Sequence, residues 1–77
     1  MKRYVKEFAN DVVNHLSEIS KTAIMKANAD DVIAVNDSFN KRIEKIKKIL
    51  KLNERNYISD FETIAVISEI ERGNNNE

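Results

Sequence analysis

The chain contains no proline, and its only glycine, Gly73, lies close to the C-terminal end. These two residue types most often break helices, so nothing before Gly73 forces the backbone out of a helical conformation. Apolar residues recur at helical rather than alternating spacing. The sequence therefore predicts an all-α fold. We expect a three-helix bundle, in which a long antiparallel helical hairpin carries a shorter C-terminal helix, with residues 1–73 as one domain and 74–77 as a disordered tail.

The middle helix gives the clearest periodic signal. Spacings of four, three and four residues place its main apolar side chains within roughly 60° of arc. These side chains are Phe39, Ile43, Ile46 and Leu50. Val32 and Val35 extend the stripe backwards, and we expect a helix from about Ala29 to Leu52–Glu54. Because the polar Asn36 lies near the stripe, a break around Asp37–Ser38 is the alternative.

The first helix is expected from Lys2–Tyr4 to Lys21–Ala27. Its apolar residues alternate four-residue and three-residue spacings, which is the heptad pattern. They are Val5, Ala9, Val12, Leu16, Ile19 and Ala23. Asn28–Asp31 is the best turn, because Asn can close one helix or cap the next. A connection this short makes the two helices antiparallel neighbours.

A capping box marks the start of the third helix. After a polar loop, Asn53–Ser59, the sequence places Glu62 three residues beyond Ser59, the S-x-x-E pattern in which side chain and backbone cap each other. The helix is expected to continue to about Arg72, with Gly73 as its left-handed C-terminal residue.

The third helix carries apolar residues on two sides. Phe61, Ile64 and Ala65 form one side, with Tyr57 just before the helix, and Val66, Ile67 and Ile70 lie largely on the other. Either the helix is wedged between its neighbours, or one side meets a second copy of the chain. Since so small a monomer cannot easily cover both sides, we expect a homo-oligomer, most simply a homodimer, or contact with another helical protein. The candidate contact residues are Phe61, Ile64, Ile67 and Ile70.

Composition disfavours several functional classes. The 77 residues include no cysteine and one histidine, and 13 basic residues balance 13 acidic ones. No Gly-rich phosphate loop and no nucleophile–His–carboxylate pattern occurs, so we expect neither an enzyme nor a cofactor. No apolar run approaches the ~18 residues of a membrane span, and the N-terminal charges do not fit a secretory signal. These features indicate a cytoplasmic protein.

Two groups of polar residues remain as candidate binding sites. Asp11 and Glu18 share a helix face with His15, but one histidine without cysteine does not make an ordinary zinc site, so no metal is expected. The basic side of the middle helix could lie along nucleic-acid phosphates. Its residues are Lys41, Lys45, Lys48, Lys51 and Arg55. A solvated face, on which Lys47 and Lys51 pair with nearby acids, is the favoured interpretation, because no aromatic residues interleave to stack bases.

Three segments resemble a group of small uncharacterised helical proteins from bacterial mobile genetic elements or phages. They are the opening MKRYVKEFANDVVNHL, the middle RIEKIKKILKL and the closing YISDFETIAVISEI. The similarity covers most of the chain, whereas Ala23–Ser38 departs from it. The resemblance implies an accessory protein of such an element and supplies no catalytic residue. The expected function is therefore non-enzymatic, accessory or regulatory, and exerted through helix–helix contacts; the alternative is a nucleic-acid-binding accessory protein.

Overall fold

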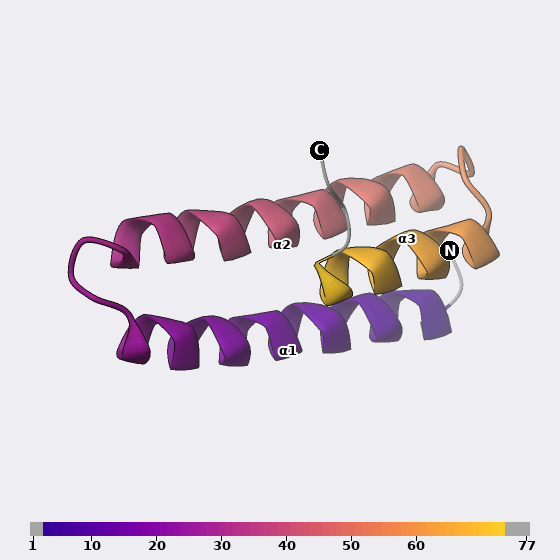
Figure 1. Ribbon diagram of the computed structural model, residues 1–77. Coiled ribbons are helices and arrows are strands. Elements are labelled where there is room, and N and C mark those ends of the chain that lie inside the picture. The colour runs from indigo at the N-terminus through magenta and orange to yellow at the C-terminus, as the bar shows by residue number, and fades with distance from the viewer. Residues whose placement is uncertain (1–2, 74–77) are drawn as a thin grey trace.

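The computed structural model describes residues 3–73 and has three helices in that part of the chain, as the sequence predicts (Figure 1). Helix α1 spans Arg3–Lys26, α2 spans Val32–Glu54 and α3 spans Asp60–Arg72. The first two run antiparallel, and α3 lies against both of them near the N-terminal end of α1 (Figure 1). The expected all-α three-helix bundle is confirmed. The predicted disordered tail lies outside the described residues.

The two connections differ slightly from the predicted ones. The α1–α2 turn is closed by the amide of Asp31, which donates to the carbonyl of Asn28 at 2.9 Å, so α2 begins three residues later than expected. Helix α2 continues unbroken past residues 37 and 38, because Asn36 is exposed and does not disturb the apolar stripe. It also continues through Asn53, and Asn56 with a φ of 64° then provides its left-handed exit.

Both predicted caps of α3 are confirmed. The Ser59 hydroxyl accepts from the amide of Glu62 at 3.1 Å, and the Glu62 carboxylate accepts from the amide of Ser59 at 3.4 Å. At the other end, Gly73 has a φ of 78°, which L residues rarely adopt, and its amide donates to the Ile70 carbonyl. Local sequence signals therefore determine where α3 begins and ends.

The hydrophobic core occupies one half of the molecule only. Its fully buried apolar residues are Val5, Ala9, Val12, Leu16, Ile46, Ile67 and Ile70. On α1 none of these lies beyond Leu16, and on α2 none precedes Ile46. This three-helix half, where α3 covers the hairpin, contains the core, whereas the two-helix half beyond the end of α3 contains no fully buried side chain (Figure 1).

The length of α3 explains this division. Helix α1 has 24 residues and α2 has 23, but α3 has 13. At about 1.5 Å per residue, α3 extends about 20 Å along a hairpin that is about 36 Å long. The molecule is accordingly elongated, with principal extents of 42 × 23 × 17 Å. No helix in the described part of the chain is long and apolar enough to cross a membrane.

Candidate helix–helix interface

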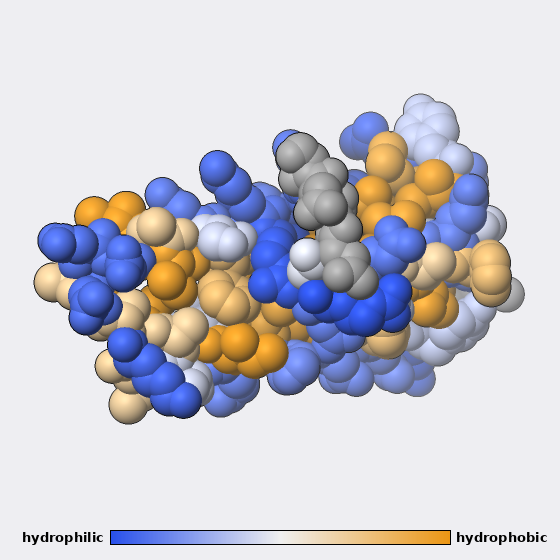
Figure 2. Space-filling model, viewed as in Figure 1, coloured by the Kyte–Doolittle hydropathy of each residue, from blue (hydrophilic) through white to orange (hydrophobic). Residues whose placement is uncertain are grey.

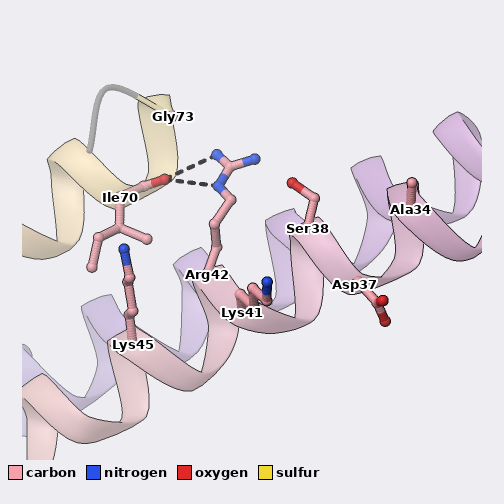
Figure 3. A pocket seen from close by; sticks show the side chains of 8 residues that line it. All are labelled: Ala34, Asp37, Ser38, Lys41, Arg42, Lys45, Ile70 and Gly73. Atoms are coloured by element: carbon pink, nitrogen blue, oxygen red, sulfur yellow. Dashed lines mark hydrogen bonds between the residues drawn. The ribbon is translucent and has the colours of Figure 1, made fainter. Parts of the chain in front are cut away.

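A side-chain clamp holds the C-terminal end of α3 against α2. Arg42 donates from Nε and Nη2 to the carbonyl of Ile70, at 3.0 and 2.9 Å (Figure 3). Its Nη2 also donates to the carbonyl of Glu71 at 2.5 Å. The guanidinium also lies over the Phe39 ring, 5.1 Å from its centroid. The last carbonyls of a helix have no partner within the helix, so a cation that binds two of them stabilises this end.

A buried amide holds the other end of α3. Asn53 is 2% exposed, and its Nδ2 donates to the Ile58 carbonyl at 3.2 Å and to Asp60 Oδ1 at 2.9 Å. The hydroxyl of Thr63, fully buried, donates to the Ser59 carbonyl at 2.7 Å. These bonds tie the start of α3 to the last turn of α2. Together with the Arg42 clamp they keep α3 over one half of the hairpin.

Beyond the end of α3, the inner faces of α1 and α2 are incompletely covered. We call this the open groove and define it by Ile19, Ala23, Val35, Ser38 and Phe39. The heptad-spaced apolar stripe of α1 continues into the groove through Ile19 and Ala23. Ile19 is 39% exposed, however, and Ala23, Val35 and Phe39 are only half-buried. Figure 2 shows hydrophobic surface between the two long helices in the half of the molecule beyond the end of α3. The groove is the position that a third helix would fill if α3 were longer.

A hollow of about 770 Å³ adjoins the open groove where α3 stops (Figure 3). On α2 it is lined by Ala34, Asp37 and Ser38, and three cationic residues, Lys41, Arg42 and Lys45, outnumber the one acid. Ile70 and Gly73 close it on the α3 side. The hollow is therefore a polar and basic extension of an apolar groove.

The four predicted contact residues of α3 do not form one surface. Ile67 and Ile70 are 0% and 1% exposed and belong to the chain's own core, so they are not available to a partner. Ile64 is half-buried, and Phe61 is 84% exposed. The wedged arrangement explains this, because α3 packs against both long helices and turns the Ile67 side inward. The exposed side retains Phe61, near the exposed Tyr57.

The basic residues of α2 lie on its outer side, as predicted, except that Lys45 is half-buried. Lys41, Lys48, Lys51 and Arg55 are exposed. Within residues 3–73, no acid lies within ion-pair distance of these four or of Lys47, so the expected pairing of Lys47 and Lys51 with nearby acids does not occur. Lys41, Lys48, Lys51 and Arg55 thus form a positively charged surface that the described part of the chain does not neutralise by direct contact.

His15 contacts an acid on α3 and not the two acids that share its own helix face. Its Nδ1 lies 2.8 Å from Glu71 Oε2 on α3, rather than joining Asp11 and Glu18. No group of three or more potential metal-binding side chains occurs in the described part of the chain. The contact is a surface link between α1 and the end of α3, with both side chains partly exposed.

Sequence reasoning did not identify the residues that position α3. Arg42 lay between two apolar positions of the stripe, and Asn53 was assigned to a loop. The signal for Arg42 was its position, since it lies about 40° from Ile46 on the inner side of the helix rather than among the outer lysines. Asn53 lies seven residues after Ile46, on the same face, which could have indicated its burial.

Comparisons with known proteins give no match among family models, curated proteins or solved structures.

Proposed function

We propose that this protein acts without catalysis, as an accessory or regulatory protein that makes helix–helix contacts and associates with itself. The observation that carries the proposal is the open groove, where two long helices present an apolar stripe with no third helix over it. An amphipathic stripe gains stability only when another element covers it. Phe61 and Tyr57 add a second exposed apolar site at the opposite end of the molecule.

Composition and the sequence resemblance support the same role. The chain has no cysteine and a single histidine, and that histidine pairs with Glu71 on the surface. The resemblance to small helical proteins of mobile elements or phages suggests an accessory function in such an element. A cytoplasmic location is part of the proposal.

Sedimentation velocity across a concentration series tests the proposal. We expect a species heavier than one chain to accumulate as the concentration rises. Ile19→Lys, which places a charge in the open groove, should abolish it. Ile33→Lys is the matched control, because Ile33 is 73% exposed and lies outside the groove. A single monomeric species at every concentration up to several hundred micromolar would contradict self-association.

The second candidate function is nucleic-acid binding through the basic side of α2. It is favoured by one observation: within residues 3–73 no acid forms an ion pair with Lys41, Lys48 or Arg55, which lie seven residues apart on one face. Fluorescence anisotropy with generic duplex DNA tests it. Binding should weaken steeply as salt rises, and Lys48→Ala should reduce the slope of the logarithmic salt plot by about one. Absence of binding at low salt would remove this candidate.

A further inference from the structure

We propose that copies of this chain also join head to tail, with the outward face of α3 of one copy docked antiparallel on the outward face of α2 of the next. The inference rests on the proposed self-association and names a second interface for it, separate from the open groove. Two different surfaces meet, so the interface is heterologous and can continue from copy to copy. The two faces are formed by Glu62, Ala65, Glu69 and Arg72 on α3 and by Asp37, Lys41, Glu44 and Lys48 on α2.

The two helices carry opposite charge. Helix α2 contains six basic and three acidic residues, whereas α3 contains one basic and four acidic residues. Part of this charge is used inside the chain, because Arg42 binds the last carbonyls of α3 and Glu71 contacts His15. The outward faces retain much of the rest, and opposite charges on two surfaces favour their association.

The outward face of α3 has a defined charge pattern. Glu62 and Glu69 lie three residues before and four residues after Ala65, so they are displaced from it by about 60° and 40° in the same rotational sense. Arg72 follows Ala65 by two turns, and Phe61, 84% exposed, lies on the other edge of the face. Within residues 3–73, neither Glu69 nor Arg72 forms an ion pair. This pattern is therefore available to a partner.

The outward face of α2 has the same spacing with charges of opposite sign. Lys41 and Lys48 lie three residues before and four residues after Glu44, displaced from it in the same rotational sense. Asp37 precedes Glu44 by two turns. All four residues are exposed, and a hollow of about 340 Å³ lies among them. Lys45 lines the same hollow but already has an interaction within the chain, and the docking does not use it.

Only the antiparallel orientation brings the unlike charges together. When two helices meet face to face and antiparallel, the same rotational edges of both helices adjoin, whereas in a parallel pair opposite edges adjoin. Glu62 therefore lies beside Lys48 of the next copy, and Glu69 lies beside Lys41. The uncharged Ala65 is opposite Glu44, so the one acid in the middle of the α2 face meets no like charge.

The ends of the contact agree with this orientation. Arg72 meets Asp37, whereas a parallel arrangement would place Arg72 beside Lys51, where like charges repel. At the other end, the exposed ring of Phe61 lies over the stem of Lys51, and an aromatic ring attracts an ammonium group at this position. The docking thus covers the most exposed aromatic residue of α3.

The small size of this contact predicts weak, salt-sensitive association. From Phe61 to Arg72 it extends about 17 Å, and a helix is about 10 Å wide, so the planar footprint is on the order of 200 Å². Stable interfaces bury about 800 Å² per partner, and exposed ion pairs are screened by salt. At physiological ionic strength the contact does not hold two chains together by itself, so the expected effect of Ile19→Lys is unchanged there.

Light scattering of the Ile19→Lys variant at low salt isolates this contact, because the charge at position 19 disables the open groove. At about 20 mM salt, where the Debye length is about 20 Å, its weight-average mass should rise with concentration beyond twice the mass of one chain. Adding either Lys41→Glu or Glu69→Lys should abolish the rise, because like charges then meet. An equal mixture of these two variants should restore it, because the reversed charges face each other.

A second pair of charge reversals is the matched control. Lys6→Glu and Asp30→Lys change the net charge by the same amounts, at exposed positions outside both faces. In the Ile19→Lys background each of them should leave the assembly intact. Assembly that survives Lys41→Glu and Glu69→Lys equally well, or that their mixture does not restore, would overturn the head-to-tail contact.

The outcome separates this contact from the proposed function. An Ile19→Lys chain that stays monomeric at low salt overturns the head-to-tail contact alone, because the natural chain at physiological salt tests the proposed function. Assembly of Ile19→Lys at low salt, with a natural chain that is monomeric at physiological salt, would instead retain the head-to-tail contact and overturn association through the groove.

Cysteine cross-linking tests the orientation, because the natural chain has no cysteine. Under mild oxidation at low salt, an equal mixture of Asp37→Cys and Arg72→Cys should give a mixed covalent dimer several-fold faster than a mixture of Lys51→Cys and Arg72→Cys. Mass spectrometry distinguishes the mixed product from dimers of one variant. Faster cross-linking in the second mixture would establish the parallel orientation and overturn the antiparallel one.

Discussion

The three-helix half and the two-helix half of this molecule are built from the same two long helices but differ in burial. On α2, Ile46 is 1% exposed beneath α3, while Val35, on the same apolar stripe beyond α3, is only half-buried. On α1, Leu16 is fully buried, and Ile19, one turn later, is 39% exposed. The comparison shows that an apolar stripe determines which face of a helix turns inward, whereas the neighbouring elements determine how much of it becomes a core.

The largest expected effect comes from truncating the same residue type in the two halves. Ile46→Ala should destabilise the protein by about 2–5 kcal/mol, because it leaves a cavity in the core. Ile19→Ala, on the inner face of the two-helix half and 39% exposed, should cost less, about 1 kcal/mol. Urea denaturation followed by circular dichroism measures both. Equal losses would mean that the two-helix half is as well packed as the three-helix half.

Removing the clamp should cost less than opening the core. Arg42→Ala deletes three hydrogen bonds to the last carbonyls of α3, and we expect a loss of about 1.5–3 kcal/mol. The amides near residue 73 should then exchange faster with solvent in hydrogen-exchange measurements. Lys48→Ala is the control on the outer side of α2 and should leave both the stability and the amide exchange rates unchanged. Unaltered exchange at this end in Arg42→Ala would show that the clamp does not hold α3.

Removing the cap of α3 should have a smaller effect. Ser59→Ala deletes the side-chain half of the capping box and should lower stability by about 1 kcal/mol, whereas Ser59→Gly should cost only a few tenths. Thermal denaturation of the three proteins measures the difference. If Ala and Gly were equally tolerated, the capping box would not contribute to the position of α3.

The smallest expected effect is at the surface link between α1 and α3. His15→Gln should reduce stability by less than about 1 kcal/mol, since both His15 and Glu71 are partly exposed and such pairs are screened by solvent. Repeating the denaturation at high salt should shrink this difference further. A loss of stability as large as that of Arg42→Ala would mean that the His15–Glu71 pair also holds α3 in place.

Much of the fold was predictable because its signals are local. The capping box at Ser59, the left-handed Gly73 and the stripe through Ile46 each depend on residues within a turn or two of one another. The candidate interface was less predictable, because the contact residues chosen on α3 included Ile67 and Ile70, which the fold buries. A two-faced helix has the same sequence pattern whether a second helix or a second molecule covers it.

The three helices, their inward faces and the ends of α3 follow from the chain's local signals, because periodicity and caps act over short distances along one chain. The role of Arg42 and Asn53, which hold α3 over one half of the hairpin, follows only from how the helices pack. The same packing leaves Ile19 and Val35 partly uncovered. These outcomes depend on which elements, distant in sequence, pack against each other. The burial of a residue follows from that packing and not from its own segment alone.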